Sequence, residues 1–189
     1  ILVSGRTAIA CLTLSVTQCC AASDLFLKLD SIQGESRDRV HRNEIDVTDW
    51  SWGLSTSGNA HSGGGGGDGK PVFQELSLTK WVDRSTPSLM LAVANGKQFS
   101  RAVLVVRRSG EHPVEFLKLT LKGVRVSGLN TGSSPGDRLP EFVTLSFQEV
   151  TLDYVQVDAR GAPADQISFY WDVANNTGGS AGDADGDGI

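Results

Sequence analysis

The fold is decided above all by the stretch FVTLSFQEVTLDYVQV, residues 142–157. Apolar and polar residues alternate along it, which is the pattern of a half-buried β-strand. The apolar positions change phase midway, from Val143, Leu145 and Phe147 to Val150, Leu152 and Tyr154. A change of phase by one residue moves the apolar side chains to the other face of the strand. The strand must therefore bulge or pass from one packed sheet to another.

Two further stretches, 44–55 and 114–127, change phase in the same way. Their apolar positions are Ile45 and Val47, then Trp50, Trp52 and Leu54, and in the second stretch Leu117, Leu119 and Leu121, then Val124 and Val126. Three such strands favour a strongly bent sheet that closes into a barrel over a flat open sheet. The full set of predicted strands is 25–30, 44–55, 72–82, 102–108, 114–127, 142–157 and 167–173. The predicted fold class is mainly β, a small closed β-barrel of two strongly bent sheets flanked by one short α-helix.

The helix is predicted at residues 86–96, TPSLMLAVANG. A Thr at its start, Pro in its first turn and Asn-Gly at its end are helix start and stop signals. Ser88 is its only polar interior residue, whereas a helix on the outside of a monomer normally has a polar face. We therefore expect two covers for this helix, the barrel and a neighbouring subunit. The expected oligomer contacts on it are Leu89, Met90, Leu91 and Val93.

A glycine-rich loop spans residues 57–70. A phosphate-binding loop would lead into a helix with Lys followed by Ser or Thr, but Lys70 is followed by Pro71 and a predicted strand. The composition instead predicts a mobile connection that becomes ordered on contact with a partner. The second set of expected oligomer contacts is its run of glycines, Gly63, Gly64, Gly65, Gly66 and Gly67.

Residues 1–22 predict a cleaved secretory signal peptide. Arg6 precedes an uncharged stretch from Thr7 to Val16, and small residues precede a cleavage site after Ala22. The stretch is shorter than the roughly 20 apolar residues of a membrane-spanning helix, so no membrane insertion is expected. A buried strand is the alternative interpretation. The segment holds all three cysteines of the chain, so a cleaved chain would have no thiol for a disulfide, a zinc site or a nucleophile.

The C-terminal part, residues 174–189, has a Gly/Ser-rich linker composition and then a partial calcium-loop motif. Carboxylates at alternate positions followed by Gly form the first half of such a loop, because a hard cation needs oxygen ligands that converge round a tight turn. The candidate metal ligands are Asp183, Asp185 and Asp187. Calcium at this tail is the one cofactor expected, and none is expected in the domain at 23–173.

Composition and motifs exclude several functions. A net charge of −5 without a basic cluster argues against a nucleic-acid partner, which would need clustered Lys and Arg. The histidines, His41, His61 and His112, lie in or beside predicted loops without metalloprotease spacing, and no G-x-S-x-G motif is present. No enzyme is therefore expected. Trp50 and Trp52 have two interpretations, a platform for sugar rings and, favoured, the filling of the barrel core or its rim.

Several stretches together resemble the Hcp family, the tube protein of type VI secretion systems. The resemblance covers roughly residues 24–154 and rests on order and spacing, because no single motif is decisive. The matching stretches are 24–30 with Gly34-Glu35-Ser36, 44–47 with Trp50-Ser51-Trp52-Gly53, the glycine run, 76–80, 83–87, Asn95-Gly96-Lys97, 143–147 and Asp153-Tyr154.

The resemblance implies a small β-barrel flanked by one helix, which assembles as homo-hexameric rings that stack into a hollow tube. Such a tube carries effector proteins in its lumen or fused to its end. The signal peptide and the tail depart from the family pattern. Export to the periplasm or the outside is expected if the signal is cleaved, and expulsion from the cytoplasm by the type VI apparatus otherwise. The alternative function is an exported β-domain that binds carbohydrate or another cell-surface ligand.

Overall fold

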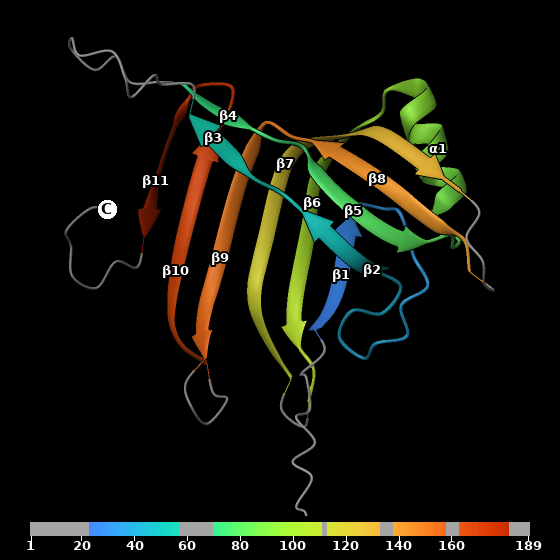
Figure 1. Ribbon diagram of the computed structural model, residues 1–189, viewed down its shortest axis with the longest axis horizontal. Helices are drawn as coiled ribbons and strands as arrows, with labels where there is room; N and C mark the ends of the chain where they lie inside the picture. Colours follow the sequence, from blue (N-terminus) through green and yellow to red (C-terminus); the bar gives the residue numbers. More distant parts are fainter. Residues whose placement is uncertain (1–22, 57–69, 111–112, 133–137, 158–162, 182–189) are drawn as a thin grey trace, which may run out of the picture.

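The computed structural model describes residues 23–56, 70–110, 113–132, 138–157 and 163–181. These residues form eleven strands and one helix (Figure 1). In chain order they are β1 (Ser23–Leu29), β2 (Ile45–Ser51), β3 (Leu54–Thr56), β4 (Pro71–Phe73), β5 (Leu76–Trp81), α1 (Thr86–Asn95), β6 (Gln98–Arg108), β7 (Val114–Thr131), β8 (Pro140–Ser146), β9 (Glu149–Val157), β10 (Pro163–Asp172) and β11 (Thr177–Ala181).

Six antiparallel strands close into a barrel, in the order β7, β6, β1, β2, β5 and β8, with β8 paired again to β7. The strand β7 makes closure possible because its two halves have different partners. Its C-terminal half pairs with β8, where Val126 lies opposite Leu145, and its N-terminal half pairs with β9, where Leu119 lies opposite Leu152. The predicted mainly β fold, with a closed barrel and one short helix, is confirmed.

Beyond the barrel the sheet continues outward from β7 through β9, β10 and β11. We call these three strands the wing. In Figure 1 the wing lies at one end of the long axis of the molecule and α1 at the other. The strands β3 and β4 form a separate two-stranded sheet, which crosses near the upper end of the wing in this view.

The predicted single strand 142–157 is wrong in detail, because residues 147 and 148 separate β8 from β9. The two strands nevertheless keep one register against β7, where Arg125 lies opposite Ser146 and Lys122 opposite Glu149. The sheet bends at this point. Gly123 has a φ of 61°, and a Cβ on it would lie 2.4 Å from the side-chain oxygen of Gln148. Only glycine suits both the left-handed conformation and the close approach.

The other two changes of phase also have a structural cause. The register between β2 and β5 shifts between Val47 and Asp49, where the apolar positions pass from Val47 to Trp50, and the change from Leu121 to Val124 on β7 falls at the left-handed Gly123. The predicted strands 44–55 and 72–82 each divide in two, because their distal parts leave the barrel and pair with each other as β3 and β4.

The linker interpretation of the segment from residue 175 to 180 is wrong, because it includes most of β11. Asp172 accepts hydrogen bonds from the backbone N–H and the side chain of Asn175, and Asn176 has a φ of 54°, which together make a tight turn. Gly178 then packs against Trp171, where a Cβ would lie 2.4 Å from the ring. The glycines therefore serve a hairpin rather than a flexible linker, and the free edge of β10 supplies the pairing partner.

The helix lies where its sequence predicts, but the predicted cap by Thr86 is wrong, because Ser85 is the N-cap and makes no side-chain capping hydrogen bond. Pro87 lies in its first turn, and Gly96, with a φ of 64°, ends it while the N–H of Lys97 donates to the carbonyl of Ala92 at 3.0 Å. Leu89 and Ala92 are buried in the core that fills the barrel. Burial of a leucine such as Leu89 stabilises the fold by about 1.5–3 kcal/mol, so this face fixes the helix on the barrel.

Candidate functional site

The helix α1 presents apolar side chains to solvent around its buried face. Met90 is 43% exposed, Leu91 63% and Val93 36%. Leu89, predicted with them as an oligomer contact, is fully buried in the core of its own chain and is absent from this surface. The barrel therefore supplies the first of the two expected covers, and Met90, Leu91 and Val93 form what we call the helix face.

A groove of about 400 Å³ runs beside the helix face. Leu91, Ala92 and Phe99 form its apolar part, and Arg84, Asn95 and Lys97 are among its polar lining residues. The groove therefore combines an apolar base with hydrogen-bond donors and positive charge. Such a mixture suits a side chain that has an apolar body and a polar tip.

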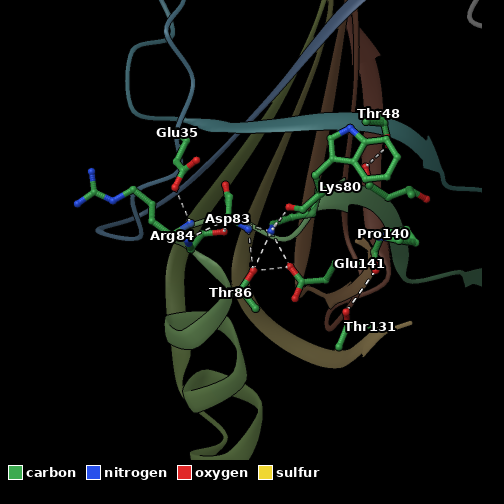
Figure 2. Close-up of polar contacts among 12 residues, drawn as sticks. Glu35, Thr48, Lys80, Asp83, Arg84, Thr86, Thr131, Pro140 and Glu141 are labelled. Carbon is green, nitrogen blue, oxygen red and sulfur yellow. Dashed lines mark hydrogen bonds and ion pairs between the residues drawn. The ribbon is translucent and has the colours of Figure 1, made fainter. Parts of the chain in front are cut away.

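The first turn of the helix is held by a buried polar network at the barrel end (Figure 2). The ammonium nitrogen of Lys80 on β5 lies 2.5 Å from Glu141 Oε2 on β8 and 2.9 Å from Asp83 Oδ1. Lys80 is only 1% exposed and Glu141 is fully buried. Buried charges of this kind persist because they are paired and hydrogen-bonded.

Thr86 joins this network to the helix. Its hydroxyl donates to Glu141 Oε2 at 2.9 Å and accepts the backbone N–H of Asp83 at 3.2 Å (Figure 2). The network links two of the barrel strands, β5 and β8, to the start of α1, and so it sets the direction in which the helix face points. The sequence carries a signal for it, because Lys80 and Glu141 occupy inward positions of alternating strands that are otherwise apolar.

A second charged cluster fixes the loop before β2 to the barrel. The guanidinium of Arg107 lies 2.7 Å from one carboxylate oxygen of Asp38 and 3.0 Å from the other, and 2.9 Å from Asp24. Hydrogen bonding to Arg107 holds the pKa of Asp38 well below its usual range, and Asp38 raises the pKa of Arg107 in turn.

His41 belongs to the same region, where its ring stacks on Phe26 at 4.2 Å and its Nδ1 lies 2.9 Å from Glu44. These contacts assign His41 a structural role.

The two tryptophans lie against the core. Trp50 and Trp52 are half-buried, and the ring centre of Trp52 is 6.3 Å from those of Phe73 and Phe147. Their position agrees with the favoured interpretation, in which they fill the core and its rim, and does not provide an exposed platform for sugar rings.

Several predicted sites lie outside the described residues. They are the signal peptide at 1–22, Gly63 to Gly67, His61, His112, and the candidate calcium ligands Asp183, Asp185 and Asp187. Within the residues that are described, no group of three or more His, Cys, Asp or Glu side chains is arranged to hold a metal ion. In the same part of the chain, no helix has the length and apolar character needed to cross a membrane.

The geometry is that of a small closed β-barrel with a wing and an apolar helix face, and comparison with known proteins identifies its class. The family model described as "Type VI secretion system effector, Hcp" matches residues 26–154, which is more than half of the chain. The chain therefore belongs to the Hcp family.

Individual relatives agree with this assignment. Protein hcp1 of Pseudomonas aeruginosa is 48% identical over 158 residues, which are 82% of this chain and 98% of the relative. A solved type six secretion system protein superposes with a TM-score of 0.79 at 30% identity, covering 83% of this chain and 99% of that one. Hcp1 from Salmonella typhimurium superposes with a TM-score of 0.66 at 32% identity, covering 83% and 99%.

The predicted function is confirmed at this level. The chain is a structural, tube-forming protein of type VI secretion, and the carbohydrate-binding alternative is not favoured. Its family is a secreted one, so export is supported as well.

Proposed function

We propose that the chain assembles as a homo-hexameric ring, that rings stack into a hollow tube, and that the tube carries or exports effector proteins. The observation that carries this proposal is the helix face. Met90 and Val93, three residues apart, lie on one flank of the helix and Leu91 on the other, and all three are exposed. Exposed apolar side chains on an ordered element mark an interaction site. A tube of one kind of subunit needs identical contacts at each step round the ring, and a fixed apolar surface is suited to that role.

The proposed contact between rings is the loop that holds Gly63 to Gly67. The strands on either side of it support this role, because Leu54 on β3 pairs with Phe73 on β4 and Thr56 pairs with Pro71. The residues on either side of the loop are therefore held together by strand pairing. Deletion of residues 63–67 is expected to preserve folding and hexamers, since loop length changes stability only weakly. Electron microscopy should show shortened tubes or none, and unchanged tubes would contradict the role in stacking.

The proposed route of export begins with the signal peptide. Cleavage after Ala22 would remove all three cysteines. N-terminal sequencing of the secreted protein checks this, and a mature form that keeps Cys19 would contradict it.

Calcium is proposed to bind only at Asp183, Asp185 and Asp187, so the melting temperature of the barrel should stay the same on addition of calcium.

The helix face is tested by the substitution Leu91→Gln. Leu91 makes little contact with its own barrel, so the variant should keep the circular dichroism spectrum of the wild type while losing hexamers in native mass spectrometry. Val40→Gln is a matched control, because Val40 is 69% exposed and lies in the loop before β2. Hexamers of undiminished abundance in Leu91→Gln, or a monomeric wild type, would refute the proposal.

A further inference from the structure

The apolar rows of the barrel interior continue without interruption into the wing. Three rows cross β7, β9 and β10 in register. They are Leu121–Val150–Trp171, Leu119–Leu152–Phe169 and Leu117–Tyr154–Ile167. Side chains opposite one another on neighbouring antiparallel strands share a face, so the rows form one apolar surface.

The first of the three rows is covered within the described part of the chain, whereas the last row, Leu117–Tyr154–Ile167, is partly exposed. Phe73 on β4 packs against Trp171 with ring centres 6.0 Å apart, so the first row is closed by the β3–β4 sheet. In the last row Tyr154 is 41% exposed and Ile167 is 45% exposed. We call these two residues, with Leu117 beside them, the wing face.

The opposite side of the wing is polar and needs no cover. The hydroxyl of Ser168 donates to Asp153 at 2.7 Å there, across the pair β9–β10. Tyr170 is also on that side, because it alternates with Phe169 and Trp171 along β10. The wing is therefore amphipathic, with one face built for burial and only partly buried in a single chain.

The charges of the wing do not lie on the wing face. Glu149 and Asp153 alternate with the apolar residues of β9 and so point to the polar side, where they pair with Lys122 and Lys118 of β7. The row of Tyr154 and Ile167 itself carries no charge, which suits burial in an apolar contact.

The two surfaces also lie where a ring requires them. The wing and α1 are at opposite ends of the long axis of the molecule (Figure 1). A ring of identical subunits is built from head-to-tail contacts, in which each copy offers two different surfaces to its two neighbours. A two-fold dimer would instead need one self-complementary surface.

We propose that the wing face of one copy packs against the helix face of the next copy, with Tyr154 and Ile167 lying in the groove beside α1. The apolar base of the groove at Leu91 and Phe99 takes the apolar parts, and Lys97 and Asn95 are donors for the tyrosine hydroxyl. This inference rests on the ring of the proposed function and names the surface that the helix face contacts.

The first test is Ile167→Asp with Tyr170→Asp as its matched control. Both residues are exposed on β10, Ile167 on the apolar side and Tyr170, at 53%, on the polar side. A charge buried in an apolar contact costs enough free energy that Ile167→Asp should lower the hexamer fraction at least about tenfold at matched concentration. Tyr170→Asp should stay within about twofold of the wild type. Native mass spectrometry gives the fractions, and circular dichroism confirms the fold.

The second test locates the partner surface and needs no disruptive change. In a chain whose Cys11, Cys19 and Cys20 are replaced by serine, Leu91→Cys combined with Ile167→Cys should form disulfides between subunits and give a ladder of up to six on a non-reducing gel. A disulfide requires Cα atoms within about 7 Å, so two ends of one chain cannot react with each other. The pair Leu91→Cys with Tyr170→Cys should give no ladder.

The outcomes separate this inference from the proposal beneath it. A wild type without hexamers overturns both. Hexamers that persist in Ile167→Asp, or that show no ladder with Leu91→Cys and Ile167→Cys, overturn the wing contact and leave the ring standing. A ladder from the Tyr170→Cys pair assigns the contact to the polar side and overturns the inference as well.

Discussion

The barrel and the wing belong to the same sheet, yet apolar residues on the same face are buried in the barrel and partly exposed in the wing. Leu119 is fully buried on β7, whereas Ile167 on β10, in the adjoining row and on the same face, is 45% exposed. The barrel closes on itself, so each inward side chain meets the opposite wall. In the part of the chain that the structure describes, the wing has no opposite wall beyond the β3–β4 sheet. An apolar row is therefore a core where the sheet closes and an interaction surface where it does not.

The barrel contains a buried pair of opposite charges. Removing one partner of this pair is the strongest test of whether the barrel is closed to water. Lys80→Met should destabilise the fold by about 3–5 kcal/mol, because it leaves Glu141 charged and unpaired in the interior. The free energy of unfolding from urea denaturation gives the value. The double variant Lys80→Met with Glu141→Leu should recover most of the loss, since replacing both partners by apolar groups removes the unpaired charge. A single variant as stable as the wild type would show that water reaches this end of the barrel.

Truncation of one apolar residue in each region compares barrel and wing directly. Leu119→Ala should cost about 2–5 kcal/mol, because it opens a cavity in a closed core. Ile167→Ala should cost less in the isolated monomer, about 1 kcal/mol, because water already reaches its side chain. Thermal and urea unfolding of monomeric protein measure both. Equal losses would mean that the wing is covered within its own chain.

The bend between the two regions depends on Gly123. Gly123→Ala should destabilise the fold by roughly 1–2 kcal/mol, since a side chain disfavours its left-handed backbone and the new methyl group meets Gln148. Gly132→Ala is the matched control, because nothing lies within 4 Å of a Cβ placed there. Urea denaturation of the two variants checks the difference. An unaffected Gly123→Ala would show that the bend does not need this glycine.

Acid should weaken the barrel through Asp38. Its pKa is lower in the folded chain than the usual 3.8, so its stabilising effect is complete above that value and is lost as the pH falls toward the folded pKa. Asp38→Asn should therefore be less stable than the wild type at pH 7, and the gap should narrow below about pH 4. Asp172→Asn provides the comparison in the wing, where hydrogen bonds from Asn175 lower the pKa of an exposed carboxylate. A gap that stays constant with pH would contradict the role of Asp38.

Local patterns in the sequence predict most of the fold because they depend on neighbouring residues. The period-two alternation locates the strands, and the signals at Pro87 and Gly96 locate the helix. The changes of phase in three stretches indicate closure of the barrel. The Lys80–Glu141 pair was missed even though both residues interrupt apolar alternation, because pairing of residues 61 positions apart depends on register.

Composition misled where a residue type has more than one use. The glycines at 178 and 179 suggested a linker, but they make room for Trp171 and Tyr170 in a hairpin. Leu89 and Leu91 were grouped as oligomer contacts because both are apolar and adjacent on an uninterrupted helix. The structure separates them, since only Leu89 faces the barrel.

The sequence by itself determined the strands, the single helix, the bent closed sheet and the resemblance to the Hcp family. These features follow from local periodicity and from the order of short motifs. Only the tertiary structure decided which apolar residues are left over after closure. The exposure of a side chain depends on which part of the chain packs opposite it. For Leu91 and Ile167 this packing is set by helix docking and strand pairing between distant parts of the chain.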